Sequence, residues 1–373
     1  MKKIITNKSK ILNVYLLHYH YPFVVTGKVV LKLFFILTCI FFLNTNSFAN
    51  TSAVILQYHH VSEHTPPSTS ISPEKFKAHI QWIKDNEFQV LTLSEIVQTL
   101  QNKKELAHSK VLAITFDDAN RSVCENAWPI LKKHKLPFTL FISTEALEKN
   151  YQSQCSWAAL KEMYESGLMT PANHSHQHLN MISSSILKKK EWAKLMSDEL
   201  VKAQDLIEQK IGYASMLFAY PFGEYNHALT TLITQLGFTG FGQHSGAIGH
   251  QSDFSALPRF PASGQFANLE SLSTKLYSLA FPANVLASTD NPVIFNGENN
   301  PPYLTISFPE KNLLTTTNCY NSSGQSLPVK IESNSLIVQS ASKLEPGRHR
   351  YTCTSKSNIP DRFYWYSHQW LIE

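Results

Sequence analysis

The sequence lacks an excess of charge of either sign once its first 49 residues are set aside. The whole chain has 33 basic and 28 acidic residues, but residues 1–49 contain six lysines and no acidic residue. The remainder is therefore close to neutral, with 27 basic and 28 acidic side chains. A nucleic-acid-binding protein concentrates positive charge on its surface, so this class loses its main support. An aromatic content of 12% in a near-neutral chain better suits an uncharged carbohydrate.

The apolar run near the N-terminus is too short to span a bilayer. It extends from Leu33 to Leu43, whereas a membrane-spanning helix needs about 20 apolar residues. Lys28 and Lys32 precede it, and Ser47-Phe-Ala49 fits the small-residue rule for signal peptidase. We therefore predict a signal peptide over residues 1–49 and an exported protein, periplasmic or secreted. The residue before Cys39 does not suit a lipoprotein signal, so a soluble form is favoured over a lipoprotein.

Cysteine is also scarce, with five in 373 residues. Cleavage after Ala49 would remove Cys39 and leave four, an even number suited to disulfides in an oxidising compartment. We expect Cys319 to pair with Cys353, and Cys124 with Cys155. Four cysteines allow three connectivities, so the other pairings stay open.

The stretch that organises the chain is an apolar, β-prone run that ends in two carboxylates. Val111 to Phe116 reads as a buried strand, and Asp117 and Asp118 follow it. In α/β proteins, ligand sites lie at the carboxyl ends of strands. Successive side chains there point in different directions, so one carboxylate can bind a metal while its neighbour acts as a general base. The alternative is a solvated acidic pair at the end of a strand.

A second candidate segment, Asn173 to His178, contains three histidines. His174 and His178 are four residues apart, so on a helical turn both imidazoles share one face and can bind one ion. Two histidines and an aspartate leave coordination positions open, as in catalytic zinc sites. His176 would point away from the ion. The histidines alone are weak evidence for a metal, and the nearby aspartates strengthen it.

These segments resemble the motifs of a known family. Thr115-Phe-Asp-Asp118 followed by His174-Ser-x-x-His178 is similar to the first two motifs of the NodB-type polysaccharide deacetylases, carbohydrate esterase family 4. Ala219-Tyr-Pro-Phe-Gly223 resembles the third motif, and the similarity spans about Val54 to Pro261. The resemblance implies a distorted (β/α) barrel and an enzyme, a polysaccharide N-deacetylase. It also implies that Asp117 is the base and that the metal is held by Asp118, His174 and His178.

The implied reaction is metal-dependent hydrolysis of N-acetyl groups from an N-acetylglucosamine-containing polysaccharide, with release of acetate. Zinc suits two histidines and an aspartate best, although cobalt and nickel are compatible. An acetylated amino-sugar polymer or oligomer is the expected partner, with neither nucleic acid nor a stable membrane span. The alternatives are a weak or inactive carbohydrate-binding protein on the same fold, an O-acetyl esterase, or a peptidoglycan deacetylase.

The sequence departs from the family pattern in three places. Ala219 stands where the third motif usually has arginine, and we predict that Arg259 replaces it by pairing with Asp117. Phe222 stands in place of tyrosine, but its backbone N–H can still bind an oxyanion. No late Leu-x-His segment supplies the usual general acid. The strand that ends in Tyr58-His59 resembles the poly-N-acetylglucosamine deacetylase sub-branch, so His59 is our candidate acid; His60, His244 and His250 are the rivals. The alternative is that His59 is merely hydrogen-bonded at a strand end.

Strand-like and helix-like stretches alternate from Val54 onward, which is typical of an α/β fold. We expect helices over residues 72–86, 93–100, 120–134, 156–166, 186–211, 225–236 and 269–279. Beyond Pro282 the helical periodicity disappears, and β-prone runs follow at 303–308, 312–320, 329–331, 335–339, 349–354 and 363–371. We therefore predict a deacetylase domain over residues 50–284 and an accessory β-sandwich of the Ig-like type over 285–373. Its aromatic run, Phe363 to Tyr366 with Trp370, either binds sugars or fills a core.

Overall fold

The structure is a computed structural model that describes residues 51–287, 293–294, 299–309 and 311–373. The predicted signal peptide therefore lies outside the described residues. Within the part of the chain that is described, no helix is both long and apolar enough to cross a membrane.

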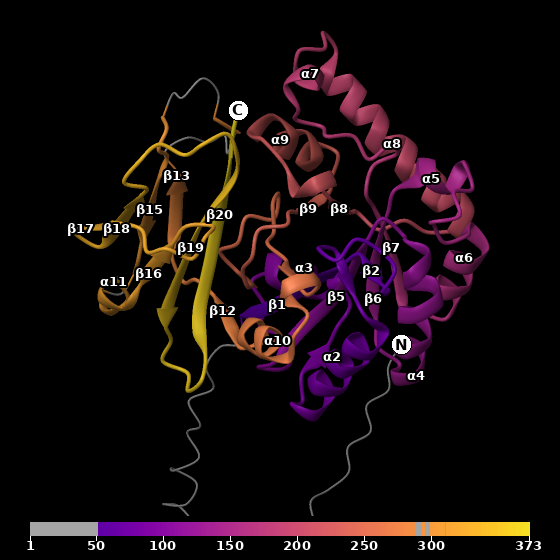
Figure 1. Cartoon of the computed structure of the whole chain (residues 1–373), viewed down its shortest axis with the longest axis horizontal. Helices are drawn as coiled ribbons and strands as arrows, with labels where there is room; N and C mark the ends of the chain where they lie inside the picture. The colour runs from indigo at the N-terminus through magenta and orange to yellow at the C-terminus, as the bar shows by residue number, and fades with distance from the viewer. Residues whose placement is uncertain (1–50, 288–292, 295–298, 310) are drawn as a thin grey trace, which may run out of the picture. The chain divides into compact units, whose positions relative to one another are not determined.

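A curved sheet of nine strands forms the first part of the molecule (Figure 1). Its central strands are parallel and run in the order β1, β5, β6, β7, β8, β9, with short strands at the edges. Their bounds are β1 Ser52–Tyr58, β5 Val111–Asp117, β6 Phe138–Ile142, β7 Met169–Asn173, β8 Leu217–Ala219 and β9 Thr239–Phe241. The edge strands are β4 Gln89–Val90, β10 Ile248–Gly249 and β11 Phe260–Pro261. The predicted α/β class is confirmed.

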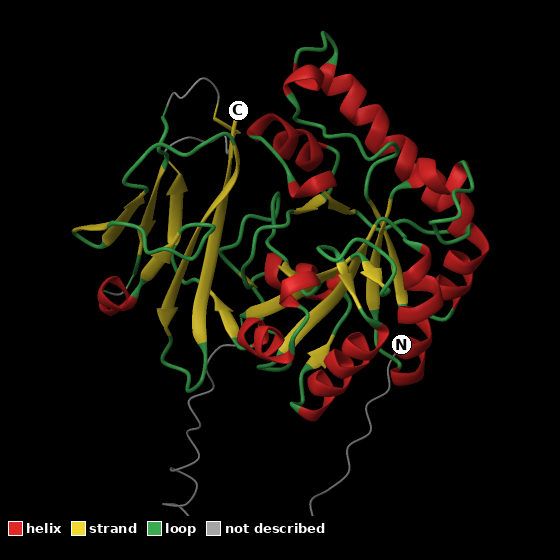
Figure 2. Cartoon of the chain, in the orientation of Figure 1, coloured by secondary structure: helices red, strands yellow, loops and turns green. Residues whose placement is uncertain are grey.

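Helices cover the outer face of this sheet (Figure 2). They are α2 Pro73–Asp85, α4 Trp128–His134, α6 Trp157–Glu165, α8 Trp192–Ile211, α9 His227–Gln235 and α10 Leu269–Leu276. Helix α3 Leu93–Gln101 packs instead with the inner core cluster. Ser72 caps α2 by accepting from the Lys75 N–H, and Pro73 follows it in the first turn, where proline is tolerated. The expected helix at 120–134 starts with a π-turn, Val123–Ala127. The expected helix at 186–211 divides into α7 Ser184–Leu187 and α8, and the break includes the lysine run 188–190.

Alternation along β1 and β5 decides which side chains reach the inside of the curved sheet. Val54, Leu56 and Tyr58 pack in one core cluster with the outer helices, whereas Ala53 and Ile55 belong to the inner cluster. Side chains two residues apart on a strand share a face, so Gln57 continues the inner row. By the same rule, Val111, Ala113, Thr115 and Asp117 form one row on β5. Polar side chains at the carboxyl end of each row therefore point into the mouth of the sheet.

The C-terminal part consists of two further sheets. One contains β12 Ser278–Ala280, β14 Val293–Ile294, β16 Asn318–Tyr320, β19 Gly347–Lys356 and β20 Phe363–Ile372. The other contains β13 Asn284–Ala287, β15 Tyr303–Ser307, β17 Val329–Glu332 and β18 Ser335–Gln339. Both contribute to one apolar core, whose members include Leu304, Ile306, Leu336, Val338, Tyr351 and Trp370. The two sheets therefore pack face to face.

Two expectations for this region were wrong. Residues 312–320 are not one strand, because Asn312–Thr316 is helix α11 and only Asn318–Tyr320 is strand. Leu313 and Leu314 are both buried in the same core, which a helical turn allows and a strand, with its alternating faces, does not. The helix predicted to reach Leu279 ends at Leu276, and the next residues form β12, which pairs in parallel with β20.

The tryptophans of the aromatic run pack in two different hydrophobic cores. Trp370 is 1% exposed inside the C-terminal core, and Trp365 packs edge-on against Phe260 with ring centroids 5.3 Å apart. Core packing is therefore the role of these two tryptophans. Both predicted disulfides, Cys124–Cys155 and Cys319–Cys353, are confirmed.

Candidate active site

Asp117 is held by a bidentate ion pair inside the mouth of the sheet. The Arg259 guanidinium donates to Asp117 Oδ1 at 2.6 Å and to Oδ2 at 2.8 Å, and neither side chain is exposed. Arg259 also donates through Nε to the Gly242 carbonyl at 3.0 Å, and its guanidinium lies over the Phe141 ring. The predicted pairing of Arg259 with Asp117 is thus present. This pairing accounts for the alanine at position 219 of the third motif, because Arg259 supplies the guanidinium in its place. Arg259 directly precedes β11, which pairs with β1.

This environment keeps Asp117 ionised. Burial raises the pKa of the carboxyl, but the charges of Arg259, His174 and His59 lower it more, and the net pKa falls from 3.8 to about 2. A carboxylate that is both buried and ionised must be compensated by hydrogen bonds and positive charge. Asp117 is therefore available to accept a proton at neutral pH.

Asp118, His174 and His178 converge beside Asp117 and form a possible metal site. One ligand atom from each residue lies within 4.8 Å of the others. The distances from Asp118 Oδ1 are 3.4 Å to His174 Nε2 and 3.5 Å to His178 Nε2. No other cluster of this kind occurs among the described histidine, cysteine and acidic side chains. The set therefore has the composition of a catalytic divalent-cation site.

The orientation of His174 supports this reading. Its Nδ1 lies 2.7 Å from the Ala219 carbonyl, so Nδ1 donates its proton there and Nε2 keeps its lone pair for a cation. Burial lowers the pKa of His174, but the hydrogen bond with Asp118 and the charges of both aspartates raise it overall. Burial and the charge of His174 lower the pKa of His178 to about 4, so its ring is neutral at pH 7. The carboxylates thus favour a positive charge in this cluster, and a cation fits it.

The histidine segment is a loop and not the helical turn that the spacing suggested. Ser175 and His178 both adopt left-handed backbone conformations, with φ of 65° and 54°. His178 N–H donates to the Ser175 hydroxyl at 3.0 Å, which closes the loop and turns the two imidazoles toward each other. Asp118 also has a positive φ, 72°. Such residues cost free energy and persist where the surroundings impose them, often at functional sites. His176 is buried and bonds Thr144, away from the cluster.

Phe222 lies on the loop that follows β8, beside His178 of the candidate metal site. Its ring centroid is 4.7 Å from that of His178, and its backbone has φ of 60°. Within the described residues its N–H has no hydrogen-bond acceptor. Gly223 next to it has φ of 70°, and a Cβ there would meet the Gln243 side chain at 2.5 Å, so only glycine fits. The Phe222 N–H is therefore a free donor at the site.

His59 is the histidine among the four candidate acids that closely approaches Asp117. Its Nε2 is 3.7 Å from Asp117 Oδ2, and its side chain is 18% exposed. His250 lies next to β10, which pairs with the opposite, amino end of β1, and it bonds the Lys104 carbonyl. His244 is buried against Tyr225, and burial lowers its pKa to about 3. His60 is the following residue on the chain, and burial lowers its pKa.

Gln57 is a member of the site that the sequence analysis missed. Its Nε2 donates to Asp117 Oδ2 at 2.7 Å, and it is 2% exposed. The available signal was a single polar residue within the apolar strand that precedes His59. Because inner-facing positions alternate, Gln57 on β1 and Asp117 on β5 belong to neighbouring inner rows.

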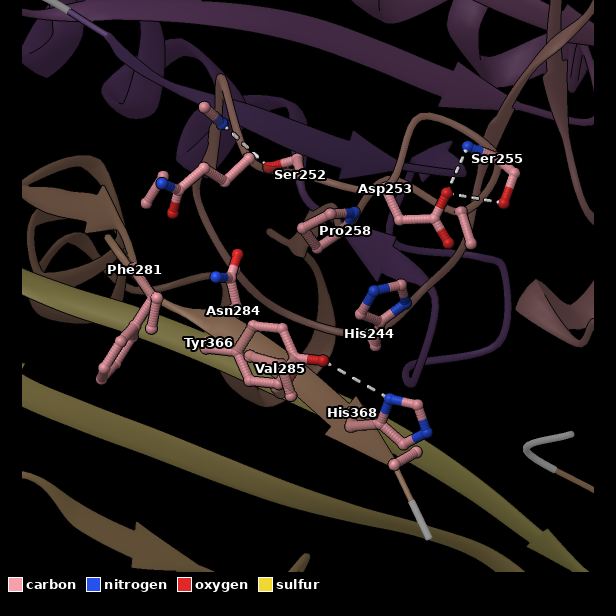
Figure 3. A pocket seen from close by; sticks show the side chains of 18 of the residues that line it. His244, Ser252, Asp253, Ser255, Pro258, Phe281, Asn284, Val285, Tyr366 and His368 are labelled. Carbon is pink, nitrogen blue, oxygen red and sulfur yellow. Dashed lines mark hydrogen bonds between the residues drawn. The ribbon is translucent and has the colours of Figure 1, made fainter. Parts of the chain in front are cut away.

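A separate cavity lies between the loop that follows β9 and strands β13 and β20. It has a volume of about 1170 Å³. His244, Asp253, Asn284, Tyr366 and His368 are among the residues that line it (Figure 3). None of the predicted catalytic or metal-binding residues lines this cavity, so the candidate active site is the open mouth of the sheet.

Comparison with other proteins is consistent with this geometry. Residues 104–241 match the family model described as polysaccharide deacetylase. A poly-beta-1,6-N-acetyl-D-glucosamine N-deacetylase of Staphylococcus aureus (strain MSSA476) is 30% identical over 232 residues, covering 57% of this chain and 79% of that protein. The Staphylococcus epidermidis protein of the same name is 27% identical over 237 residues, with the same coverage of both chains.

Solved structures share the fold. A Streptococcus pyogenes deacetylase in complex with acetate has a TM-score of 0.53 and 24% identity, covering 60% of this chain and 99% of that one. IcaB from Ammonifex degensii has a TM-score of 0.53 and 23% identity, covering 59% and 96%. The predicted NodB-type fold, the predicted sub-branch and the predicted class of enzyme are confirmed. The chain belongs to the polysaccharide deacetylase family.

Proposed function

We propose that this enzyme removes N-acetyl groups from a polysaccharide that contains N-acetylglucosamine, with a divalent cation, and releases acetate. The observation that carries the proposal is the convergence of two sets of residues at one mouth of the sheet. The buried Asp117–Arg259 pair supplies a proton acceptor, and Asp118, His174 and His178 supply a cation site beside it. The relatives named above are N-deacetylases of poly-beta-1,6-N-acetyl-D-glucosamine, which supports this substrate class.

Each residue has a separate task in amide hydrolysis. Asp117 takes a proton from water as the water oxygen adds to the carbonyl carbon. Gln57 and Arg259 both donate hydrogen bonds to the Asp117 carboxylate. These bonds fix the orientation of the carboxylate and therefore the direction of its remaining lone pairs. The Phe222 N–H donates to the oxyanion as it forms. His59 then gives a proton to the departing nitrogen as the C–N bond breaks, because an amide anion is a poor leaving group.

A divalent cation held by the three ligands would supply Lewis-acid chemistry, polarising the carbonyl and lowering the pKa of water. Zinc is the cation best suited to this donor set.

The proposal is tested by acetate release from poly-N-acetylglucosamine, chitooligosaccharides, peptidoglycan and an O-acetylated polymer, with and without a chelator. Release from an N-acetylglucosamine polymer that the chelator abolishes and added zinc restores is the expected result. Release only from the O-acetylated polymer would identify an esterase. Binding without release from any of them would identify a carbohydrate-binding protein.

His178→Ala is expected to abolish stoichiometric zinc binding without unfolding the protein. The His178 side chain is 30% exposed, so its loss removes a ligand but little packing. His176→Ala is the matched control, because His176 lies in the same loop but bonds Thr144. Elemental analysis of the purified variants, together with thermal unfolding, measures both properties. Full metal content in both His174→Ala and His178→Ala would contradict the assigned site.

His59→Ala is expected to lower turnover about 10²-fold with unchanged metal content, because a positioned general acid contributes at least this much. The basic limb of the pH–rate profile should shift or disappear, since the group that protonates the amine is gone. His250→Ala, at the other end of β1, serves as the control and should retain turnover. A pH–rate profile of His59→Ala identical to that of the unchanged enzyme would exclude the role.

We also propose that the enzyme is exported and works in the periplasm or outside the cell. The signal-like N-terminal sequence and the two disulfides support this, because disulfides persist in oxidising compartments. The two packed sheets at the C-terminus support an accessory domain of the Ig-like type, for which we keep the predicted limits 285–373.

A further inference from the structure

The outward face of hairpin β19–β20 contacts the loop that carries Phe222. Along this hairpin, Tyr351 and Trp370 face the C-terminal core. The alternate positions, including Arg348 and Gln369, therefore face the other way. Gln369 Nε2 donates to the Gly223 carbonyl at 3.0 Å, and Arg348 pairs with Glu224.

Glu224 connects this hairpin to a second loop of the active site. Its side chain is 8% exposed, and Oε1 accepts from Arg348 while Oε2 accepts from Asn180 Nδ2 at 2.8 Å. Asn180 lies two residues after His178, one of the three candidate metal ligands. Arg348 thus compensates a nearly buried charge that joins the Phe222 loop to the His178 loop. The Arg348 side chain is itself 61% exposed, and its removal leaves the Glu224 carboxylate with the Asn180 amide as a hydrogen-bond partner but without this counter-charge.

The Phe222 loop has a backbone that needs such support. Phe222 and Gly223 are two consecutive residues with left-handed φ, 60° and 70°. A non-glycine residue in this region is held there by its surroundings. The contacts at Gly223 and Glu224 act directly after Phe222, and the Arg348 guanidinium lies 6.0 Å from the Phe222 ring centroid. The direction of the Phe222 N–H therefore depends on side chains from the end of the chain.

We propose that Arg348 and Gln369 are positioning residues of the deacetylase site. Gln369 fixes the loop that presents the Phe222 N–H to the oxyanion, and Arg348 fixes the same loop and, through Glu224 and Asn180, the His178 loop. The C-terminal sheets thereby form part of the catalytic unit. The catalytic effect of these residues rests on the proposed function. Their contacts with the loop can be tested without any substrate.

The test uses four variants of the full chain. Arg348→Ala and Gln369→Met remove the two contacts, Arg348→Lys keeps the positive charge, and Arg362→Ala is the control. Arg362 is a second arginine of the C-terminal part, and it donates to the carbonyls of Ser109 at 2.6 Å and Ser278 at 3.2 Å, neither of which belongs to the site. Partners that orient site residues typically contribute about 10–100-fold when removed. We expect kcat on a short N-acetylglucosamine oligomer to fall about 10-fold in Arg348→Ala and Gln369→Met, with KM nearly unchanged. Arg348→Lys should recover most of the loss, and Arg362→Ala should lower Tm but not kcat.

Amide hydrogen exchange over residues 220–224 gives a readout that is independent of the reaction. Exchange there should be faster in Arg348→Ala and Gln369→Met than in the unchanged enzyme or in Arg362→Ala. Unchanged exchange and kcat in both variants, or an equal loss of kcat in Arg362→Ala, would overturn the proposal. If the unchanged enzyme releases no acetate from any polymer, the proposed function fails, whereas the exchange experiment still decides whether these residues hold the loop.

Discussion

Asp117→Asn is expected to lower turnover by about 10²–10⁴-fold while zinc binding is retained, because the amide cannot act as a general base. The replacement keeps the shape of the side chain, and its carbonyl oxygen can still accept a hydrogen bond from Arg259. Asp117 is not among the three candidate metal ligands, so the cation site is left intact. Steady-state kinetics and elemental analysis of the same preparation measure the two effects separately.

Asp118→Asn provides the contrast at the adjacent position. Asp118 Oδ1 faces both candidate histidine ligands, so loss of its charge should weaken zinc affinity, and turnover should recover in part at high zinc concentration. Turnover of Asp117→Asn should not respond to zinc. If the two variants behave alike in both assays, the division between base and ligand is wrong.

Arg259→Met is expected to destabilise the fold by about 3–5 kcal/mol, the usual cost of removing one partner from a buried ion pair. Arg259 and Asp117 are both 0% exposed, so the remaining carboxylate has no access to bulk water. The double variant Arg259→Met/Asp117→Asn should be more stable than Arg259→Met, because no uncompensated charge remains. Urea unfolding in the presence of a chelator measures the free energies without a contribution from metal binding. A double variant less stable than either single variant would show that the charge is not the cause.

The pH dependence of this loss has a definite sign. In the unchanged enzyme the pKa of Asp117 is lowered from 3.8 to about 2, so its contribution to stability is present above about pH 4 and is lost as the pH falls toward 2. Without Arg259, burial is the dominant influence and raises this pKa, so protonation relieves the unpaired charge. The difference in unfolding free energy between Arg259→Met and the unchanged enzyme should therefore be smaller at pH 4 than at pH 7. An equal difference at both pH values would argue against an electrostatic origin.

The sequence was enough to predict which residues the structure brings together at the candidate site. Asp117 and Asp118 end an apolar strand, and His174 and His178 follow another, so the rule that parallel strands present their carboxyl ends together brings them close. The ion pair of Arg259 with Asp117 was also predictable, because the missing arginine of the third motif needed a replacement. The proximity of the aspartates and histidines follows from strand ends and residue types, whereas the Arg259 pairing also needed the resemblance to the family's third motif.

The backbone of the site and its outer contacts were not predictable in this way. The left-handed residues Ser175 and His178 turn the imidazoles together, and nothing in the spacing distinguishes that loop from a helical turn. To predict that Gln57 belongs to the site, one must know which face of β1 points inward. Arg348 and Gln369 meet Glu224 and Gly223 across more than 120 residues, so only the three-dimensional structure shows that they are neighbours. The same holds for the pairing of β12 with β20.

That pairing has a consequence for how the molecule assembles. β12 directly follows α10 of the first part, yet its hydrogen-bonding partner is the last strand of the chain. Parallel strands so distant in sequence can join only after the intervening chain has closed a long loop, which makes such pairing slow relative to local structure. We therefore expect the loop that carries Phe222 to acquire its contacts with Arg348 and Gln369 late in folding. The catalytic site would then become fully ordered only when the C-terminal sheet has assembled on the folded barrel.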